Sequence, residues 1–264
     1  MKISATIICF NEEKNIERCL NSLQGIVDEI VVVDSFSTDK TEEICSKFDI
    51  VFIKNKFLGH IEQKNFALTK AKYDYVLSLD ADEAISPELR KSILEIKQGN
   101  QDKDSLDFDS YSFNRITNYC GEGWIKYSGW YPDTKLRLWD KTKGSWGGEN
   151  PHDMVIVQKG IKTKWLKGDL LHYSYYSVQE HINQLNKFST IGAIEKYRKG
   201  KKVSILSIIL KPIWKFIRDY IFKGGFLDGF AGFKICIISA FQTFIKYVKL
   251  KELYKKSLLS DKKL

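Results

Sequence analysis

The sequence predicts an α/β fold with a mostly parallel central sheet, and two patterns support this prediction. Short apolar runs alternate with amphipathic helical patterns through the first hundred residues, which is typical of parallel strands joined by helical crossovers. Two of these runs end in acidic residues. With 264 residues, of which 43% are hydrophobic, the chain can bury the core of one ordinary domain and still carry an appendage.

The first half of the chain contains three early strands and the helices that connect them. Strands are expected over residues 3–9, 28–34 and 51–53, and helices over residues 16–23, 41–48 and 60–71. The apolar residues of the first two helices recur at spacings of three and four, which places them on one face. Each helix therefore has a side that can cover the sheet.

The fourth strand carries the clearest signal of a functional site. A short apolar run over residues 75–79 ends in Asp80, Asp82 and Glu83. Oxygen ligands at the carboxyl end of a parallel strand suit Mg²⁺ or Mn²⁺ bound together with a phosphate. The alternative is a polar loop that leads into the next helix, whose cap is predicted at Ser86, and the two interpretations are compatible.

The second half of the chain changes to short strands rich in aromatic residues. These strands are predicted over residues 111–115, 135–139 and 154–157. Aromatic rings beside acids and amides suit a sugar, although each ring could equally fill a core. The rings in question are those of Trp124, Trp130, Tyr131 and Trp146. A helix is expected to begin near Ser177, with Glu180 completing a capping box.

The C-terminal region, residues 200–264, combines lysines with large apolar residues. Its apolar run after Lys234 has 11 residues, whereas spanning a bilayer needs about 20. This composition predicts an interfacial or hairpin-forming segment on an anionic membrane surface. A helical subdomain packed on the core, or an oligomer face, is the alternative. Nucleic acid is disfavoured because large aliphatic residues separate the charges.

The predicted organisation is thus a catalytic domain over residues 1–199 and a membrane-attachment region over residues 200–264. The catalytic domain divides into a donor half, residues 1–109, and an acceptor half, residues 110–199. The net charge of +9 is concentrated in the C-terminal region.

The cysteines and the N-terminus predict a cytoplasmic location on the inner face of the cytoplasmic membrane. Five cysteines are scattered through the chain without a C-x-x-C pair, which favours a reducing compartment and disfavours a structural zinc site. The first residues form a strand pattern without a cleavage site, so no secretion signal is expected.

Two nucleotide-binding classes are disfavoured by the absence of their glycine motifs. The chain has neither G-x-G-x-x-G nor G-x-x-x-x-G-K-[ST], which argues against a dinucleotide dehydrogenase and a P-loop kinase. A nucleotidyltransferase and a catalytically inactive membrane scaffold stay open. The segment Cys9–Glu13 lacks the glycines and bases expected of a triphosphate loop, and the presence of both Asp80 and Asp82 disfavours a scaffold.

Several motifs together resemble the family 2 glycosyltransferases of GT-A fold. The motifs are Ile7–Glu12, Val33–Asp39 and Leu79–Asp82. A further set is similar to the branch that includes the lipopolysaccharide core β-1,4-glucosyltransferases, and it consists of Gln63–Asn65, Lys135–Trp139 and Pro151–Asp153. The resemblance covers about residues 1–195 well and the region from Gly224 to Tyr247 more loosely.

The resemblance implies inverting transfer of a hexose, with glucose favoured, from a UDP-sugar to a hydroxyl of a membrane-linked glycan. Asp82 would hold a divalent cation, Mn²⁺ or Mg²⁺, that bridges the diphosphate. Asp34 would bind the uracil, and Asp80 would lie near the ribose and the donor sugar. Family members often have two adjacent acids where this chain has Asp34 followed by Ser35. The other donor-side residues would be Cys9, Phe10, Asn11, Glu12, Gln63, Asn65, Arg137 and His152.

Inversion by a single displacement needs one general base on the acceptor side of the sugar. Asp153 is the first candidate because it follows a proline-fixed turn, and Glu149 and Asp133 are the next. Each could instead be a solvated or capping acid. His152 and His172 could orient the acceptor or the diphosphate, and Arg137 could reach the pyrophosphate or pair with a buried acid. The acceptor could be a glycolipid or a polysaccharide precursor.

Overall fold

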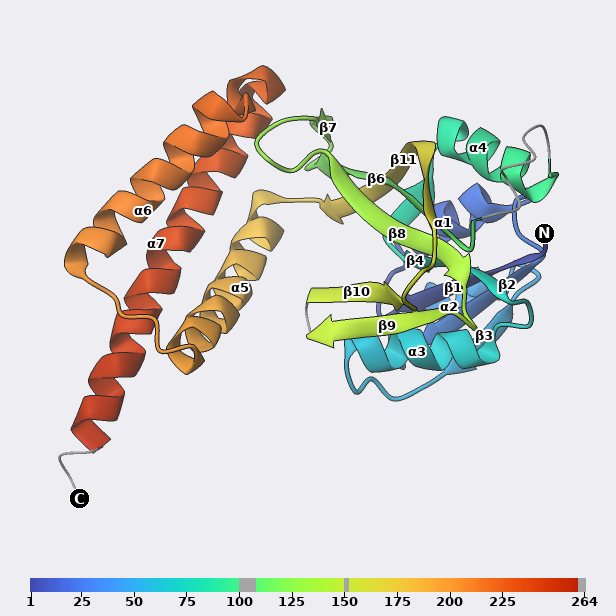
Figure 1. Cartoon of the computed structure of the whole chain (residues 1–264), viewed down its shortest axis with the longest axis horizontal. Helices are drawn as coiled ribbons and strands as arrows, with labels where there is room; N and C mark the ends of the chain where they lie inside the picture. The colour runs from blue at the N-terminus through green and yellow to red at the C-terminus, as the bar shows by residue number, and fades with distance from the viewer. Residues whose placement is uncertain (100–107, 150–151, 261–264) are drawn as a thin grey trace. The chain divides into compact units, whose positions relative to one another are not determined.

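The computed structural model describes residues 1–99, 108–149 and 152–260, except for the side chains of Glu149, His152 and residues 257–260. The chain forms two compact units, coloured along the sequence in Figure 1. The sheet unit comprises residues 1–116 and 133–173, and the helical unit comprises residues 117–132 and 174–264.

The sheet unit is built on one large mixed sheet. Its four parallel strands lie in the order β3 (Val51–Lys54), β2 (Glu29–Asp34), β1 (Ile3–Cys9) and β4 (Tyr75–Asp80). The sheet continues through β8 (Asp133–Asp140), β6 (Ser110–Tyr119), β11 (Thr163–Tyr175) and β5 (Glu83–Ile85), and β4 pairs with β8 in the antiparallel sense. A separate antiparallel hairpin consists of β9 (Gly144–Glu149) and β10 (His152–Val157).

Among the described residues, four helices accompany the strands of the sheet unit (Figure 1). They are α1 (Ile16–Leu23), α2 (Thr41–Cys45), α3 (His60–Lys70) and α4 (Pro87–Lys97). In α1 the apolar residues recur at helical spacing, and all of them are buried against the core. In α4 the Ser86 side chain accepts a hydrogen bond of 3.2 Å from the Leu89 amide, so the predicted N-cap is confirmed.

The predicted α/β fold is confirmed, and its sheet is less parallel than expected. The parallel part stops at β4 because the next strand along the sheet, β8, arrives from the second half of the chain and runs in the opposite direction. Four strands of the described residues were not predicted: β5, a two-residue strand at Trp124–Ile125, β9 and β11. Of these, the three-residue β5 and the long β11 pair with each other through Leu170 and Ile85.

The helical unit contains three long helices, α5 (Val178–Arg198), α6 (Ile205–Ile217) and α7 (Gly229–Ser260), with α7 packed against both of the others (Figure 1). Between α6 and α7 lie a π-helical turn, η2 (Arg218–Phe222), and a 3₁₀ turn, η3 (Gly225–Asp228). The short strand β7 (Trp124–Ile125) belongs here too, because the Asp228 carboxylate accepts hydrogen bonds of 3.0 Å from the amides of Lys126 and Tyr127.

The helix α5 packs in the helical unit, although the sequence placed it in the acceptor half of the catalytic domain. Its N-terminus is capped by Ser177, which accepts from the Glu180 amide as predicted. The Glu180 carboxylate accepts from the amide of Tyr176 at 2.7 Å, one residue before the position expected in a capping box. The functional division at residue 199 stays a prediction.

Within the described residues, one helix is long and apolar enough to cross a membrane, judged by length and composition alone. It covers Gly225–Lys256, and 28% of its apolar window is buried inside the structure. The prediction counted only the 11 apolar residues that follow Lys234, whereas the helix extends well beyond this run. The expectation that this segment is too short to span a bilayer therefore does not hold for the helix as a whole.

Candidate functional site

The candidate site lies where the central parallel strands end. Cys9, the last residue of β1, is paired in register with Asp34 at the end of β2, and Ile8 is paired with Asp80 at the end of β4. The two predicted acids therefore flank the same strand at the same edge of the sheet, which is the position of ligand crevices in parallel sheets.

The loops that follow β1 and β2 are joined by hydrogen bonds. Asn11, whose φ of 55° is positive, donates its amide to the Ser37 hydroxyl at 2.8 Å and accepts the Thr38 amide at 2.8 Å on its side-chain oxygen. The amide of Glu12 donates to the Thr41 hydroxyl at 2.8 Å. These bonds fix both loops at the sheet edge.

Asp34 lies fully buried at the base of these loops. One oxygen accepts the Ser37 amide at 2.8 Å and the other accepts the Ser37 hydroxyl, while the Cys9 sulfur lies 3.5 Å from the carboxylate. On the loops after β1 and β2, Phe10 and Phe36 are 56% and 54% exposed. Two exposed rings on fixed loops offer stacking surfaces for a flat ligand group.

Glu12 sits beside the other acids of the site and is partly buried. Burial, together with the nearby Asp82 and Asp39, raises the pKa of Glu12 to about 7, although the hydrogen bond of 2.8 Å that its carboxylate accepts from Asn15 lowers it. A carboxyl group that titrates near neutral pH at a ligand site is typical of a functional position.

The acids of β4 belong to a chain of ion pairs in which carboxylates and cations alternate. Lys64 Nζ lies 2.7 Å from Asp153 and 2.9 Å from Asp80. Arg137 Nη2 lies 3.2 Å from both Asp80 and Glu83. We call this set, with its continuation below, the ion-pair chain.

The ion-pair chain continues from Glu83 across the sheet. Arg115 contacts Glu83 at 3.3 Å and Asp133 at 2.9 Å, and Asp133 also pairs with Lys135 at 2.9 Å. Two of the three candidate bases, Asp153 and Asp133, thus lie at opposite ends of one network. The side chain of the third, Glu149, and that of His152 lie outside the described residues.

Asp80 and Arg137 hold each other in their charged forms. Burial alone would raise the pKa of Asp80, but Lys64 and Arg137 bring it well below its usual range. Burial opposes the charge on Arg137 as well, yet Glu83 and Asp80 raise its pKa. Its Nη1 is buried and has no hydrogen-bond partner among the described residues.

Asp82 has a different environment from Asp80. Its Oδ2 lies 3.2 Å from Nε2 of His172 on β11, and in the described part of the chain it forms no ion pair with a lysine or arginine. The backbone brings the two residues together, because the Tyr173 amide donates to the Asp82 carbonyl at 2.9 Å. The Asp82 carboxylate is an oxygen ligand of the kind that Mn²⁺ and Mg²⁺ prefer, whereas the His172 imidazole suits a transition metal such as Mn²⁺ better than Mg²⁺.

No group of three or more histidine, cysteine or acidic side chains that could hold a metal is present in the described residues. Asp82 and His172 would therefore supply two ligands, and a bound diphosphate would have to supply others. This division is common for cations that bind together with phosphates.

Comparison with known proteins identifies the family. Residues 4–168 match the family model described as glycosyl transferase family 2. A glycosyltransferase of Rickettsia typhi, RT0209, described as uncharacterized, is 35% identical over 265 residues, which cover 97% of this chain and 89% of that protein. The chain belongs to glycosyltransferase family 2.

A second relative of this family 2 enzyme is the lipopolysaccharide core biosynthesis glycosyltransferase LpsC of Rhizobium meliloti, with 28% identity over 95% of this chain and 92% of LpsC. A crystal structure of S. aureus TarS residues 1–349 with UDP aligns over 97% of this chain and 92% of that chain, at 17% identity with a TM-score of 0.43. Family membership confirms the predicted glycosyltransferase activity and the GT-A fold.

The side chains of two residues predicted to bind the donor form hydrogen bonds within this glycosyltransferase. The Gln63 side chain is buried, donates to Ser35 at 3.1 Å and accepts from Asn55 at 2.8 Å. Asn65 makes two hydrogen bonds, of 2.9 and 3.0 Å, to the backbone of Trp146. These contacts fix α3 to the ends of the strands and to the β9–β10 hairpin.

Sequence reasoning missed three features of the site in this family 2 enzyme. Lys64 stands inside a motif without a predicted role, although it links Asp80 to Asp153. His172 was predicted to orient the acceptor or the diphosphate, and its pairing with Asp82 was not foreseen. Phe36 could have been noticed as an aromatic residue inside a polar loop.

The structure decides between the two roles that the sequence left open for Trp146, which were stacking on a sugar and filling a core. In the structure Trp146 is buried against Trp139 and covers the ammonium group of Lys64. The Trp146 ring therefore packs against the ion-pair chain.

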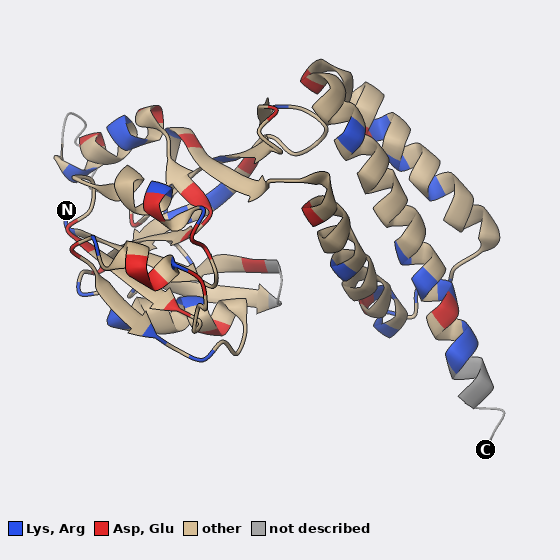
Figure 2. Ribbon diagram, turned by 180° about the vertical axis from the view of Figure 1, so that it is seen from behind, with Lys and Arg blue, Asp and Glu red and all other residues tan. Residues whose placement is uncertain are grey.

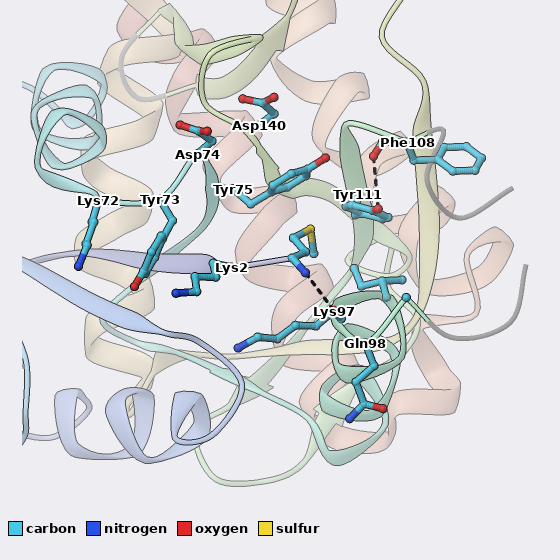
Figure 3. A pocket seen from close by; sticks show the side chains of 13 residues that line it. Lys2, Lys72, Tyr73, Asp74, Tyr75, Lys97, Gln98, Phe108, Tyr111 and Asp140 are labelled. Carbon is cyan, nitrogen blue, oxygen red and sulfur yellow. Dashed lines mark hydrogen bonds between the residues drawn. The ribbon is translucent and has the colours of Figure 1, made fainter. Parts of the chain in front are cut away.

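The enzyme also has a cavity of about 540 Å³ at the opposite end of the strands. Figure 3 shows Lys2, Tyr73, Tyr75, Tyr111 and Asp140 around it. Lys2 precedes β1 and Tyr75 begins β4, so the cavity lies at the amino ends of these strands, away from the acids. It does not belong to the candidate site.

Proposed function

We propose that this glycosyltransferase moves a hexose, with glucose favoured, from a UDP-sugar to a hydroxyl of a membrane-linked glycan such as lipopolysaccharide core. The transfer proceeds with inversion in a single displacement. The observation that carries the proposal is that two acids at the end of β4 have different neighbours. Asp80 is neutralised by Lys64 and Arg137, whereas Asp82 faces His172.

This arrangement suits a diphosphate leaving group. A divalent cation held by Asp82 and His172 would stabilise the negative charge that develops on the departing diphosphate. The exposed rings of Phe10 and Phe36 offer stacking surfaces for the base of the donor. Asp34 and the Cys9–Asn11 backbone remain the predicted neighbours of the uracil.

The general base is proposed to be Asp153. Its Oδ2 is held by Lys64, and no hydrogen bond to Oδ1 is found among the described residues. In Asp133 both oxygens pair with cations, Arg115 and Lys135. Asp153 therefore has a free oxygen that can accept the proton of an acceptor hydroxyl.

The proposed acceptor is a membrane-linked glycan, and two observations support it. The relative LpsC is named for lipopolysaccharide core biosynthesis. The helix α6 has an outer row of apolar side chains that are each more than half exposed, which suits a membrane surface. The row consists of Ile205, Leu206, Ile209, Leu210, Ile213 and Trp214. The enzyme would then work at the inner face of the cytoplasmic membrane.

Release of UDP from UDP-glucose in the presence of Mn²⁺ or Mg²⁺ tests the proposal. We expect Asp82→Asn to lower kcat by at least about 100-fold, because one cation ligand loses its charge. Asp74→Asn, just before β4 and outside the site, is the matched control and should retain activity. Turnover that needs no metal, or full activity of Asp82→Asn, would contradict the site.

The acceptor is tested separately in cells. Mass spectrometry of surface glycolipids from cells that lack this gene should show the loss of one hexose. A glycolipid profile identical to that of the parent strain would contradict a lipid-linked acceptor without affecting the donor site.

A further inference from the structure

Three lysines from three helices of the helical unit converge on one tyrosine. Lys211 of α6 donates a hydrogen bond of 3.1 Å to the hydroxyl of Tyr247 on α7. The Nζ atoms of Lys211, Lys196 on α5 and Lys246 on α7 lie 4.3, 5.6 and 5.7 Å from the centre of the Tyr247 ring. We call these three lysines the lysine cluster.

The positive charge of the lysine cluster is not balanced within the described structure. None of its members forms an ion pair with a described carboxylate. Of the acids close to Lys196 and Lys211 in sequence, Glu195 pairs with Lys199 and Asp219 pairs with Lys215. Glu195 acts on Lys246 only at longer range. Figure 2 shows that the three long helices carry many basic positions and few acidic ones.

The lysine cluster is built on a packed base and open on one side. Tyr247 is 8% exposed and belongs to a core formed with Ala193, Ile208 and Leu250. Lys211 is exposed, whereas burial and the neighbouring Lys196 lower the pKa of Lys246. Three positive charges thus surround one tyrosine, and burial makes the charge on Lys246 unfavourable, so an anion bound beside the ring would be stabilised by all three.

The tyrosine hydroxyl adds a directional group. It accepts from Lys211, and its own proton has no acceptor among the described residues. Burial raises the pKa of Tyr247, but the hydrogen bond from Lys211 and the charges of the cluster bring it below its ordinary value. Negative charge is therefore favoured at this point. A phosphate oxygen could accept both the lysine and the tyrosine protons there.

The surroundings indicate where such a phosphate would come from. Lys211 directly follows Leu210 and is followed closely by Ile213 and Trp214, and all three apolar side chains are more than half exposed. An anion bound here would have apolar surface beside it. A headgroup phosphate with acyl chains satisfies both features.

We propose that the lysine cluster and the Tyr247 hydroxyl bind the terminal phosphate of a membrane lipid, a phosphomonoester that has more free oxygens and more charge than the phosphodiester of other headgroups. The lysines supply the charge, and the hydroxyl distinguishes a phosphate with accessible oxygens from diffuse surface charge. That the phosphate comes from a lipid rests on the proposed membrane location of the enzyme. That the cluster binds a phosphate does not depend on this location.

Vesicle flotation with the full chain tests this proposal. One set of phosphatidylcholine vesicles contains phosphatidic acid and the other phosphatidylserine, adjusted to equal zeta potential. We expect at least about fivefold tighter binding to the phosphatidic acid vesicles, the effect of one well-placed lysine. Lys211→Gln and Lys246→Gln should lose this preference, and Lys211→Arg should keep it. An unchanged thermal unfolding midpoint shows that each variant is folded.

Lys202→Gln is the matched control, because Lys202 is exposed in the same unit and loses the same charge. It should weaken binding to both vesicle types equally and keep the preference. An equal loss of preference in Lys202→Gln and Lys211→Gln would overturn the proposal, since the effect would then be diffuse electrostatics.

Calorimetric titration with inorganic phosphate at constant ionic strength separates the two sources. Binding to the wild type but not to Lys211→Gln, without any vesicle preference, would retain the phosphate site and reject the lipid as its ligand. If neither phosphate binding nor vesicle preference depends on the lysine cluster, the proposal fails. Neither result bears on sugar transfer, which is measured by UDP release.

Discussion

Asp153 and Asp133 occupy opposite ends of the ion-pair chain, and their contacts predict different kinetic roles. We expect Asp153→Asn to lower kcat by about 10²–10⁴-fold, the range for loss of a general base. The KM for the donor should change little, because Asp153 is proposed to act on the acceptor. Steady-state kinetics with a purified acceptor would measure both parameters.

Asp133→Asn serves as the comparison for Asp153→Asn. It removes an acid whose two oxygens already pair with Arg115 and Lys135. We expect a loss smaller than about tenfold, since this acid has no free oxygen for a proton. A larger loss of kcat in Asp133→Asn than in Asp153→Asn would show that Asp133 and not Asp153 is the general base.

Glu12 gives the stability of the protein a predictable pH dependence. Burial raises its pKa from an ordinary value of 4.5 to about 7. Between these values the folded chain holds a proton that the unfolded chain has released, so the free energy of unfolding falls as the pH rises through this window. Glu12→Gln should remove this contribution.

Urea denaturation of both proteins at several pH values measures the effect. We subtract the free energy of unfolding of Glu12→Gln from that of the wild type. This difference should decrease by at most about 3 kcal/mol as the pH rises from about 4.5 to 7.5, and the decrease is smaller where solvent screens the charge. A difference that stays constant with pH would show that Glu12 titrates at its ordinary value.

At the residue scale, the sequence was informative about acids and not about their partners. Asp34, Asp80 and Asp82 were found because parallel strands bring their carboxyl ends together, which local patterns reveal. Lys64 and Asp153 are 89 residues apart, and their contact depends on how the hairpin packs on α3. No local pattern contains that information.

At the scale of elements, the close approach of β11 to α4 depends on Gly168. Its φ is +99°, and a Cβ there would lie 2.2 Å from the Leu89 amide nitrogen. We expect Gly168→Ala to push away the start of α4, whose Leu89 is fully buried. The cost should be about 2 kcal/mol or more beyond the backbone strain, as for other overpacked sites.

Gly160→Ala is the control for Gly168→Ala, because it measures the cost of backbone strain without a steric contact. Gly160 has a similar φ of +93°, but no atom lies within 4 Å of its added Cβ. Chemical denaturation of the two variants compares them directly, and their difference reports the contact with α4 alone. Equal destabilisation would show that the approach of β11 to α4 is not tight.

The strands β5 and β11 were missed because no local sequence pattern marks them. The strand β5 has three residues, too few for a periodic pattern, and its partner residues on β11 lie far along the chain, as Leu170 does from Ile85. The early strands were predictable because each is apolar, long enough and followed by a helix.

At the scale of the whole molecule, membrane attachment is expected to depend on the outer row of α6. Ile213→Ser should weaken binding to vesicles by about tenfold, because a half-exposed isoleucine contributes about 1–2 kcal/mol when lipid covers it. Ile156→Ser on β10 is the control, since Ile156 is 54% exposed and Ile213 is 51% exposed. Equal binding of the two variants in a flotation assay would contradict attachment through α6.

The concentration of positive charge and apolar residues near the C-terminus was visible in the sequence, and it holds in the structure. The grouping of α5 with α6 and α7 was not visible. It arises from contacts such as those of Lys249 with Asn186 and Ser189, in which polar side chains join two helices about 60 residues apart.

The apolar rows of the helical unit have a practical consequence for purification. Along α7 and the turn before it, aromatic rings with exposed surface repeat at helical intervals, and in plain buffer this apolar surface faces water. The rings belong to Phe226, Phe230, Phe233, Phe241 and Phe244. We therefore expect the isolated enzyme to self-associate as its concentration rises and to become monodisperse once a mild detergent coats these rings.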